Sequence, residues 1–228
     1  MKYLFFTLLV FVIVNCSNEQ TSKSVSTLSS FIDSTSYALG ADLGENLKKQ
    51  NVEIDYDVFM AGLTDGMETG LIKLDQKQRR EVMALLQRKL REKADSEGEN
   101  NLILADQFLK NNKEKENIKE TPTGLQYRII KEGIGSSPKR EDRVKVHYVG
   151  KLMDGSEFDS SIKRGEPSEF GLTQVIKGWT EGLQLMKLGA KYEFFIHPKI
   201  AYGSRARPTI PANSLLIFEV ELLEIVGK

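Results

Sequence analysis

The apolar pattern of this chain changes its period once, near residue 120, and no other feature constrains the fold as strongly. Before this point, apolar residues recur at the three- and four-residue spacing of amphipathic helices. After residues 119–124 (KETPTG), they alternate with polar residues, as in strands with one buried face. We therefore predict an α+β protein, in which an all-α region of residues 33–118 precedes a mainly antiparallel β domain of residues 119–228.

Three segments of the all-α region have helical apolar spacing. Asp57 and Asp75 are candidate N-caps of the second and third segments, because an aspartate can accept hydrogen bonds from the free N–H groups of a first helical turn. We therefore expect three helices, whose apolar stripes are Tyr37, Leu39, Leu43 and Leu47 in the first, Val58, Phe59, Leu63 and Met67 in the second, and Val82, Leu85, Leu86 and Leu90 in the third.

The third segment continues to Asn112, but over residues 91–101 (REKADSEGENN) it is polar on every side. A helix of this kind usually connects packed units through solvent, or it is not stable. Gly98 costs the helix about 1 kcal/mol relative to alanine, which leaves a break at this position open. If the helix is unbroken from Asp75 to Asn112, it forms a stalk about 57 Å long.

The two short helices and one end of a stalk are too small to bury an independent core. Their apolar stripes, together with Met60, Met67 and Met83, therefore suggest a partner, most simply a second copy of the chain. The alternative is a monomer in which the stripes pack on the C-terminal domain. We favour a homodimer that forms through residues 33–118.

The N-terminus has the features of a targeting segment. Lys2 precedes an uncharged stretch, LFFTLLVFVIV, that is too short to span a bilayer and fits a signal peptide of residues 1–15. The sole cysteine, Cys16, ends the sequence IVNC, which resembles a bacterial lipobox, although Asn15 departs from the usual small residue. An ordinary cleaved signal is the alternative. We expect an exported protein, lipid-anchored at Cys16 in the bacterial cell envelope, at the outer membrane and facing the periplasm or the surface, with a flexible tether over residues 16–32.

Charge and composition exclude several classes of function. The chain has 32 basic and 32 acidic residues, so nothing suggests a nucleic-acid partner. Two histidines and one cysteine cannot form a typical metal cluster or an intramolecular disulfide. We therefore expect neither a metal site nor a cofactor.

The β domain contains four segments that alternate as strands do and one short helical segment. The helix is expected at residues 180–188 and is closed by Gly189. Several antiparallel strands that wrap around this helix make a domain of ordinary size. The strand segments are residues 125–130 (LQYRII), 143–150 (RVKVHYVG), 190–198 (AKYEFFIHP) and 214–226 (SLLIFEVELLEIV).

Three motifs in this domain, VKVHYVGKLMDGSEFDSS, QVIKGWTEGLQLMKLGAKYEFFIHPKIAYG and IPANSLLIFEVELLEI, resemble the successive signatures of FKBP-type peptidyl-prolyl isomerases. The resemblance covers residues 121–228. The helical region, with SYALGADLG and GLQY, is similar to the macrophage infectivity potentiator branch, in which two protomers interlace their short helices and long stalks hold the isomerase domains apart. Together, these resemblances imply an isomerase that acts on proline-containing polypeptides, assists folding in the cell envelope and binds ligands of the rapamycin and tacrolimus type.

The resemblance also implies a role for individual residues. Trp179 would form the floor under a prolyl ring, and the Ile176 backbone N–H and the Tyr202 phenol would each face a carbonyl oxygen. Asp159 would lie at the rim, hydrogen-bonded to Tyr148. The walls would be formed by Tyr148, Phe158, Phe170, Val175, Ile176 and Phe218, and Ile210 would cap the pocket.

On pattern alone, most of these residues would be core residues, and a tryptophan at a helix start more often packs than binds. His147 and His197 have no evident partners, and we interpret both as structural. Lys163, Arg164, Arg205 and Arg207 make the rim basic, which suggests a preference for acidic residues around the proline. A chaperone or host-contact protein, which would use the same pocket and the cleft between the stalks without turnover, is the alternative function.

Overall fold

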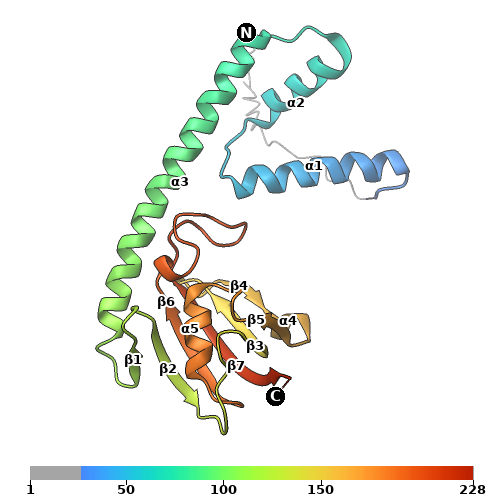
Figure 1. Cartoon of the computed structure of the whole chain (residues 1–228). Coiled ribbons are helices and arrows are strands. Elements are labelled where there is room, and N and C mark those ends of the chain that lie inside the picture. The colour runs from blue at the N-terminus through green and yellow to red at the C-terminus, as the bar shows by residue number, and fades with distance from the viewer. Residues whose placement is uncertain (1–26, 228) are drawn as a thin grey trace, which may run out of the picture. The chain divides into compact units, whose positions relative to one another are not determined.

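Figure 1 shows the computed structural model, which describes residues 27–227. The predicted signal peptide, Cys16 and most of the predicted tether lie outside these residues. The helices are α1 Phe31–Lys49, α2 Tyr56–Thr64, α3 Gln76–Asn112, α4 Ser161–Arg164 and α5 Lys177–Leu185, with a π-helical turn η1 at Asp65–Thr69 and a 3-10 turn η2 at Pro198–Ile200. The strands are β1 Ile118–Glu120, β2 Gln126–Lys131, β3 Arg143–Lys151, β4 Glu157–Ser160, β5 Ser168–Gly171, β6 Lys191–Ile196 and β7 Leu216–Val226.

The chain divides into two compact units, one that ends at Lys73 and one that spans Leu74–Lys228. The first unit contains α1 and α2, and neither helix has a buried residue. The second unit contains α3 together with the sheet. By these contacts the stalk helix groups with the sheet, whereas the predicted boundary at residue 118 follows the change from helices to strands along the chain.

Of the two predicted N-caps, Asp75 is confirmed and Asp57 is wrong. Asp55, and not Asp57, is the N-cap of α2, since its carboxylate accepts from the N–H groups of Asp57 and Val58 at 3.0 and 3.1 Å. At the start of α3, Asp75 and Gln78 form a reciprocal capping box, which satisfies two otherwise free N–H groups.

Helix α3 is continuous over 37 residues, and Gly98 does not break it. At 1.5 Å per residue its length is about 55 Å. No helix within residues 27–227 combines the length and the apolar character needed to cross a membrane.

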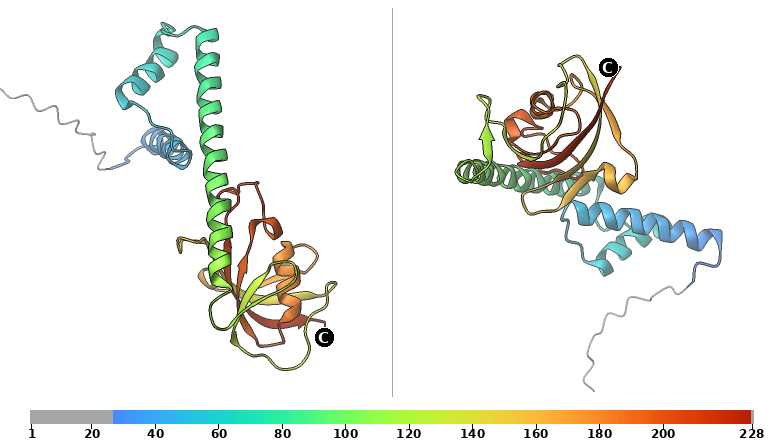
Figure 2. Two further views of the ribbon diagram at one scale, coloured as in Figure 1. Left: turned by 90° about the vertical axis from the view of Figure 1, so that its left-hand side faces the viewer. Right: turned by 90° about the horizontal axis from the view of Figure 1, so that it is seen from below.

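The sheet is antiparallel throughout, in the order β1-β2-β6-β7-β3-β4, with β5 paired to β3. It curves around α5, as Figures 1 and 2 show. The strands expected from alternation are present, and the inward residues Leu216, Phe218, Val220 and Leu222 of β7 are buried. This arrangement confirms the predicted α+β fold.

Helix α5 differs from its predicted position, because it begins at Lys177 and ends at Leu185. Ile176 and Met186 have extended backbones on either side of it, while Gly189 lies in the next turn, where its N–H donates to Leu222 O at 2.8 Å. The helix packs very close to β6. A Cβ on Gly178 would lie 2.6 Å from Ile196, and one on Gly182 would lie 2.6 Å from Phe194. Glycine at these positions lets the helix lie against the sheet.

Candidate active site

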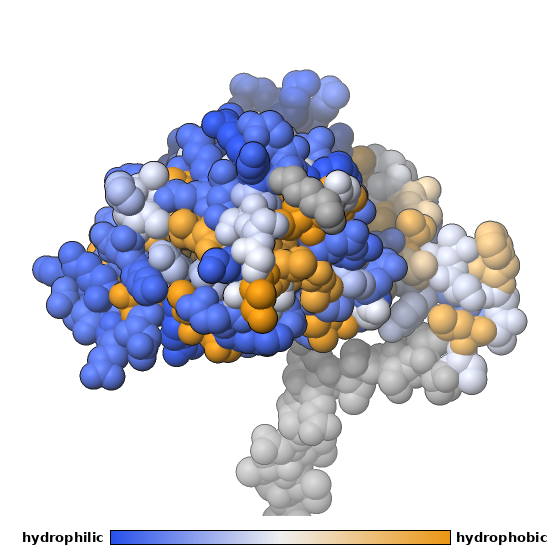
Figure 3. Space-filling model, turned by 60° about the horizontal axis from the view of Figure 1, so that its bottom comes forward, coloured by the Kyte–Doolittle hydropathy of each residue, from blue (hydrophilic) through white to orange (hydrophobic). Residues whose placement is uncertain are grey.

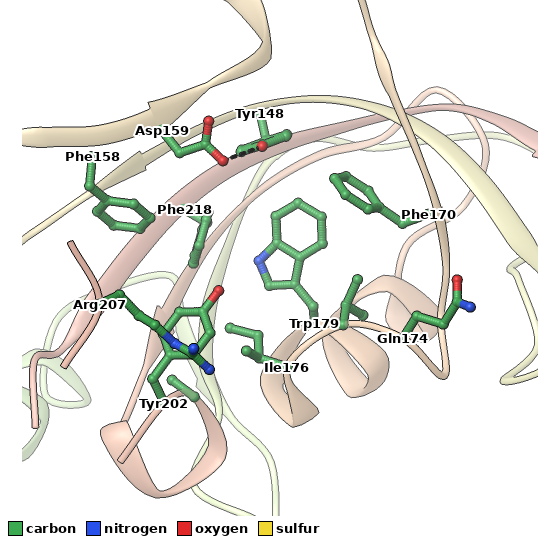
Figure 4. A pocket seen from close by; sticks show the side chains of 12 residues that line it. Tyr148, Phe158, Asp159, Phe170, Gln174, Ile176, Trp179, Tyr202, Arg207 and Phe218 are labelled. Carbon is green, nitrogen blue, oxygen red and sulfur yellow. Dashed lines mark hydrogen bonds between the residues drawn. The ribbon is translucent and has the colours of Figure 1, made fainter. Parts of the chain in front are cut away.

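A pocket of about 450 Å³ opens between α5, the edge of the sheet around β3 and β4, and the loop before β7. Figure 4 shows most of its side chains pointing toward one another across this space. The lining residues are Tyr148, Phe158, Asp159, Phe170, Gln174, Val175, Ile176, Trp179, Ala201, Tyr202, Arg207 and Phe218. The pocket is therefore mainly aromatic, with a few polar groups, as small-ligand sites usually are.

Trp179 lies at the base of this pocket, in the first turn of α5. Its indole contacts three aromatic rings nearly edge to face, with centroid distances of 5.2 Å to Tyr148, 5.5 Å to Phe170 and 5.1 Å to Phe218. Each such pair adds about 0.5–1.5 kcal/mol beyond its buried area, so the indole is held in one orientation. Its Nε1–H is buried without a hydrogen-bond partner in the described residues, and the ring nitrogen lies on the edge that faces Phe218 (Figure 4).

A polar cluster occupies the opposite rim. The pairing of β3 with β4 places Gly150 opposite Asp159, and α4 follows directly with Arg164. The Tyr148 hydroxyl donates to Asp159 Oδ2 at 2.5 Å, while Arg164 Nη1 donates to Asp159 Oδ1 and Arg164 Nη2 donates to the Tyr148 oxygen at 2.9 Å. The carboxylate is therefore held by a phenol and a guanidinium.

This cluster fixes the charge state of both of its acids. Burial acts to raise the pKa of Asp159, but the hydrogen bonds from Tyr148 and Arg164 outweigh burial and lower that pKa below its usual range. Burial, with the hydrogen bond to Asp159, raises the pKa of the Tyr148 phenol. At neutral pH the rim therefore presents an ionised carboxylate and a neutral phenol.

Two further polar groups border the pocket. Ile176 lies in the extended segment before α5, and its backbone N–H makes no hydrogen bond within residues 27–227. Tyr202 follows η2, and the guanidinium of Arg207 lies 5.1 Å from the centre of its ring. An N–H and a phenol are thus available to carbonyl oxygens of a bound molecule.

All the site residues expected from the resemblance line this pocket except Ile210. That residue is buried in the core of the sheet domain and hydrogen-bonds through its backbone to Arg207. Gln174 and Ala201 line the pocket without having been predicted. Arg207 also lines it, and Arg164 completes the cluster at Asp159, although the sequence indicated both only as basic residues of the rim.

Both histidines have hydrogen-bond partners that were not evident from the sequence, and neither lines the pocket, in line with their interpretation as structural residues. His147 Nδ1 lies 3.0 Å from Ser161 Oγ, and His197 Nε2 lies 3.0 Å from Asp106 Oδ1 of α3. These partners come from distant parts of the chain, which the pattern of either strand cannot indicate. Within the described residues, no three His, Cys, Asp or Glu side chains gather closely enough to hold a metal ion.

Comparisons with known proteins agree with this geometry. Residues 135–223 match the family described as "FKBP-type peptidyl-prolyl cis-trans isomerase", and residues 32–129 match the "Domain amino terminal to FKBP-type peptidyl-prolyl isomerase". A protein of Aeromonas hydrophila, "FKBP-type peptidyl-prolyl cis-trans isomerase FkpA", is 42% identical over 207 residues, which are 86% of this chain and 77% of that protein. The "Outer membrane protein MIP" of Legionella longbeachae is 40% identical over 214 residues, which are 92% of each chain.

The similarity extends to solved structures. The crystal structure of FkpA from Escherichia coli superposes with a TM-score of 0.64 at 34% identity, covering 87% of this chain and 98% of that one. A peptidyl-prolyl cis-trans isomerase from Pseudomonas syringae gives a TM-score of 0.53 at 38% identity, covering 56% of this chain and 94% of that one.

Proposed function

This chain belongs to the FKBP-type peptidyl-prolyl cis-trans isomerases, and we propose that its catalysis takes place in the pocket above Trp179. The observation that supports this assignment is that one pocket combines an aromatic floor and aromatic walls with the Tyr148–Asp159 pair and with the Ile176 N–H, which has no hydrogen-bond partner within residues 27–227. These groups come from three separate motifs of the sequence. Residues that served only to fill the hydrophobic core would not line an open pocket together with these polar groups.

The reaction needs no covalent chemistry. Rotation about an X-Pro amide has a barrier of about 18–20 kcal/mol, because rotation breaks amide resonance. A catalyst must therefore bind the twisted amide better than the planar one. The planar amide is the more charge-separated form, so an apolar and water-poor pocket disfavours it relative to the twisted form.

Each part of the pocket has a role in this mechanism. Trp179 supports the prolyl ring, and the aromatic walls exclude water from the amide. The Ile176 N–H and the Tyr202 phenol hold substrate carbonyl groups. Asp159, kept ionised by its partners, faces the rotating amide from the rim.

The direct test is a prolyl cis–trans exchange assay with proline-containing peptides, with and without tacrolimus. We expect exchange that is fast and is inhibited by the drug. Asp159→Leu and Tyr202→Phe should each slow it while circular dichroism remains that of the wild type. Unchanged turnover in both variants would refute the assignment of the site.

The helical unit supports a second proposal, that the protein is a homodimer through residues 33–118. Large apolar side chains of this region are exposed, at levels from 42% to 78% in the single chain. Surfaces of this kind usually mark an interface. They include Tyr37, Leu39, Leu43, Tyr56, Val58, Met60, Leu63, Met67, Leu71, Val82, Met83 and Leu85.

Sedimentation of the chain from residue 17 onward tests the dimer. We expect a dimer that dissociates in a Leu39→Lys, Leu43→Lys variant and persists in an Asp42→Lys control, since Asp42 lies on the same helix but is polar. A monomeric wild type would reject the proposal.

We also propose that the protein is anchored in the cell envelope through a lipid on Cys16. The lipobox-like sequence supports this, and the similar protein of Legionella longbeachae is named an outer membrane protein. Labelling of cells with an alkyne fatty acid should mark the wild type and not Cys16→Ser. Equal labelling, or none in either protein, would count against the anchor.

Figure 3 shows that the face of the molecule turned to the viewer is largely hydrophilic, with apolar residues in small patches. That surface gives no reason to place this face of the protein in a lipid phase. An anchor at the N-terminus, with the folded units in water, is consistent with it.

A further inference from the structure

The loop of residues 203–213, here called the rim loop, connects the pocket to the last strand. Its two ends meet, because the Asn213 N–H donates to Gly203 O at 2.8 Å, and Arg207 and Ile210 exchange backbone hydrogen bonds at 2.8 and 3.2 Å. Tyr202 directly precedes the loop, and Arg207 lies in it. Both of these side chains line the pocket, so the position of the loop affects the site.

The closed end of the rim loop is fastened to α3 by two side-chain amides. Asn101 Nδ2 donates to Ala212 O at 3.0 Å, and Asn213 Nδ2 donates to Gly98 O at 3.1 Å. Figures 1 and 2 show α3 and the segment before β7 side by side. The two bonds are reciprocal, one donated from each element, and both are partly shielded from water.

Gly98 explains how the two backbones approach so closely. It is buried, although its neighbours on α3 are exposed, and a Cβ at this position would lie 3.1 Å from the Cβ of Ala212. A glycine inside a helix costs about 1 kcal/mol relative to alanine. At this position, the absence of a side chain allows the close contact with the rim loop, and α3 remains helical on both sides of Gly98.

These bonds are separate from the contacts that hold α3 on the sheet domain. Farther along the helix, Ala105 and Leu109 are buried in an apolar cluster with Phe195 and Leu215. That cluster attaches the helix to the sheet, and none of its residues belongs to the rim loop. The amides of Asn101 and Asn213 act at the loop itself.

We infer that Gly98 and Asn101 of α3 are positioning residues for the isomerase site, which hold the rim loop and through it Tyr202 and Arg207. The inference rests on the proposed site, and it makes the stalk helix part of the catalytic unit. A change in the stalk at this level would alter the pocket, although none of its residues lines the pocket.

The test compares Asn101→Ala with Asn100→Ala in the full chain. Asn100 is exposed beside Asn101 and makes no such bond within the described residues, so it controls for a change of the same type in the same turn. Loss of one shielded hydrogen bond should raise amide hydrogen exchange in residues 203–213 about three- to tenfold. The amides of β3 and β7 should exchange as in the wild type, and kcat/KM should fall by a similar factor. Asn100→Ala should change none of these.

A rescue experiment tests the close contact. Gly98→Ala should increase exchange in the rim loop and lower kcat/KM, although alanine favours the helix, and adding Ala212→Gly should restore both. Rim-loop exchange that stays at the wild-type level in Asn101→Ala would overturn the inference. The inference would also be overturned if amide exchange rose equally in the rim loop and in the sheet. The same holds if exchange rose in the rim loop while kcat/KM stayed unchanged. If the wild type lacks isomerase activity, the proposed function fails, and loop exchange still shows whether the contact holds the loop.

Discussion

The Tyr148 hydroxyl donates a 2.5 Å hydrogen bond to Asp159 Oδ2, across the paired strands β3 and β4. The same carboxylate accepts from Arg164, so both of its oxygens are engaged by donors. The centre of the Tyr148 ring also lies 5.2 Å from the centre of the Trp179 ring, so the polar rim and the aromatic floor form one packed unit. A change at the rim should therefore also affect the floor of the pocket.

Replacing Asp159 with asparagine keeps the shape of the side chain and removes its charge. We expect kcat/KM to fall about tenfold, because a charge-assisted hydrogen bond contributes roughly 1.5–3 kcal/mol and part of it is retained by the amide. The melting temperature should fall only modestly, since the ionised carboxylate also contributes to the stability of the folded state. Glu166→Gln is the control, since Glu166 is exposed and its charge is the same. Equal losses in the two variants would point to the overall charge of the rim and not to Asp159.

The pH behaviour of Asp159 follows from its lowered pKa. Such a carboxylate stabilises the folded state above its unfolded pKa of about 3.9, and this contribution is lost as pH falls through the lower folded value. Tyr148, whose pKa is raised, stays neutral below about pH 10. We therefore expect no titration of this pair between about pH 5 and 9.

Carbon-13 NMR of the Asp159 carboxyl measures this directly. Its midpoint should lie below about 3.9 in the wild type and rise in Arg164→Gln, which lacks one of the donors. A wild-type midpoint above about 4, or no rise in the variant, would contradict the arrangement of the rim.

The sequence predicted the long strands and the pocket better than the connections between them. Residues of β3 and β7 alternate over many positions, whereas β1, β4 and β5 have only three or four residues, too few for a period. The second partner of Asp159, Arg164, could not be found either, because Arg164 reaches the carboxylate only once β4 pairs with β3 and α4 turns back. Likewise Gly98 resembled a helix break, since the Ala212 that packs on it is distant in sequence.

The single tryptophan gives the pocket its own optical signal. Tacrolimus bound above Trp179 should change the surroundings of the indole, so fluorescence should change in a saturable way with drug concentration. The midpoint should equal that for inhibition of isomerisation. Trp179→Phe should lack the signal, and inhibition without any change in wild-type fluorescence would place the ligand away from the indole.

Arg207 is the rim residue that should set a charge preference for substrates. The sequence suggested four basic residues, but Lys163 pairs with Glu157 at 3.0 Å and Arg164 pairs with Asp159, so these two charges are already engaged. Arg207 lines the pocket beside the Tyr202 ring and makes no ion pair within the described residues. Its guanidinium is therefore free to meet a carboxylate near the proline.

We expect kcat/KM to be higher for peptides with glutamate next to proline than for those with glutamine, because of the positive charge of Arg207. Partly exposed ion pairs contribute about 0.2–1 kcal/mol, so Arg207→Gln should reduce the ratio of the two kcat/KM values by up to about fivefold. The wild-type preference should weaken as salt is added, because salt screens exposed charges. Arg205→Gln is the matched control, since Arg205 is exposed in the same loop but does not line the pocket. If Arg205→Gln lowers the ratio as much as Arg207→Gln does, the preference comes from the general charge of the loop, and the particular position of Arg207 is irrelevant to it.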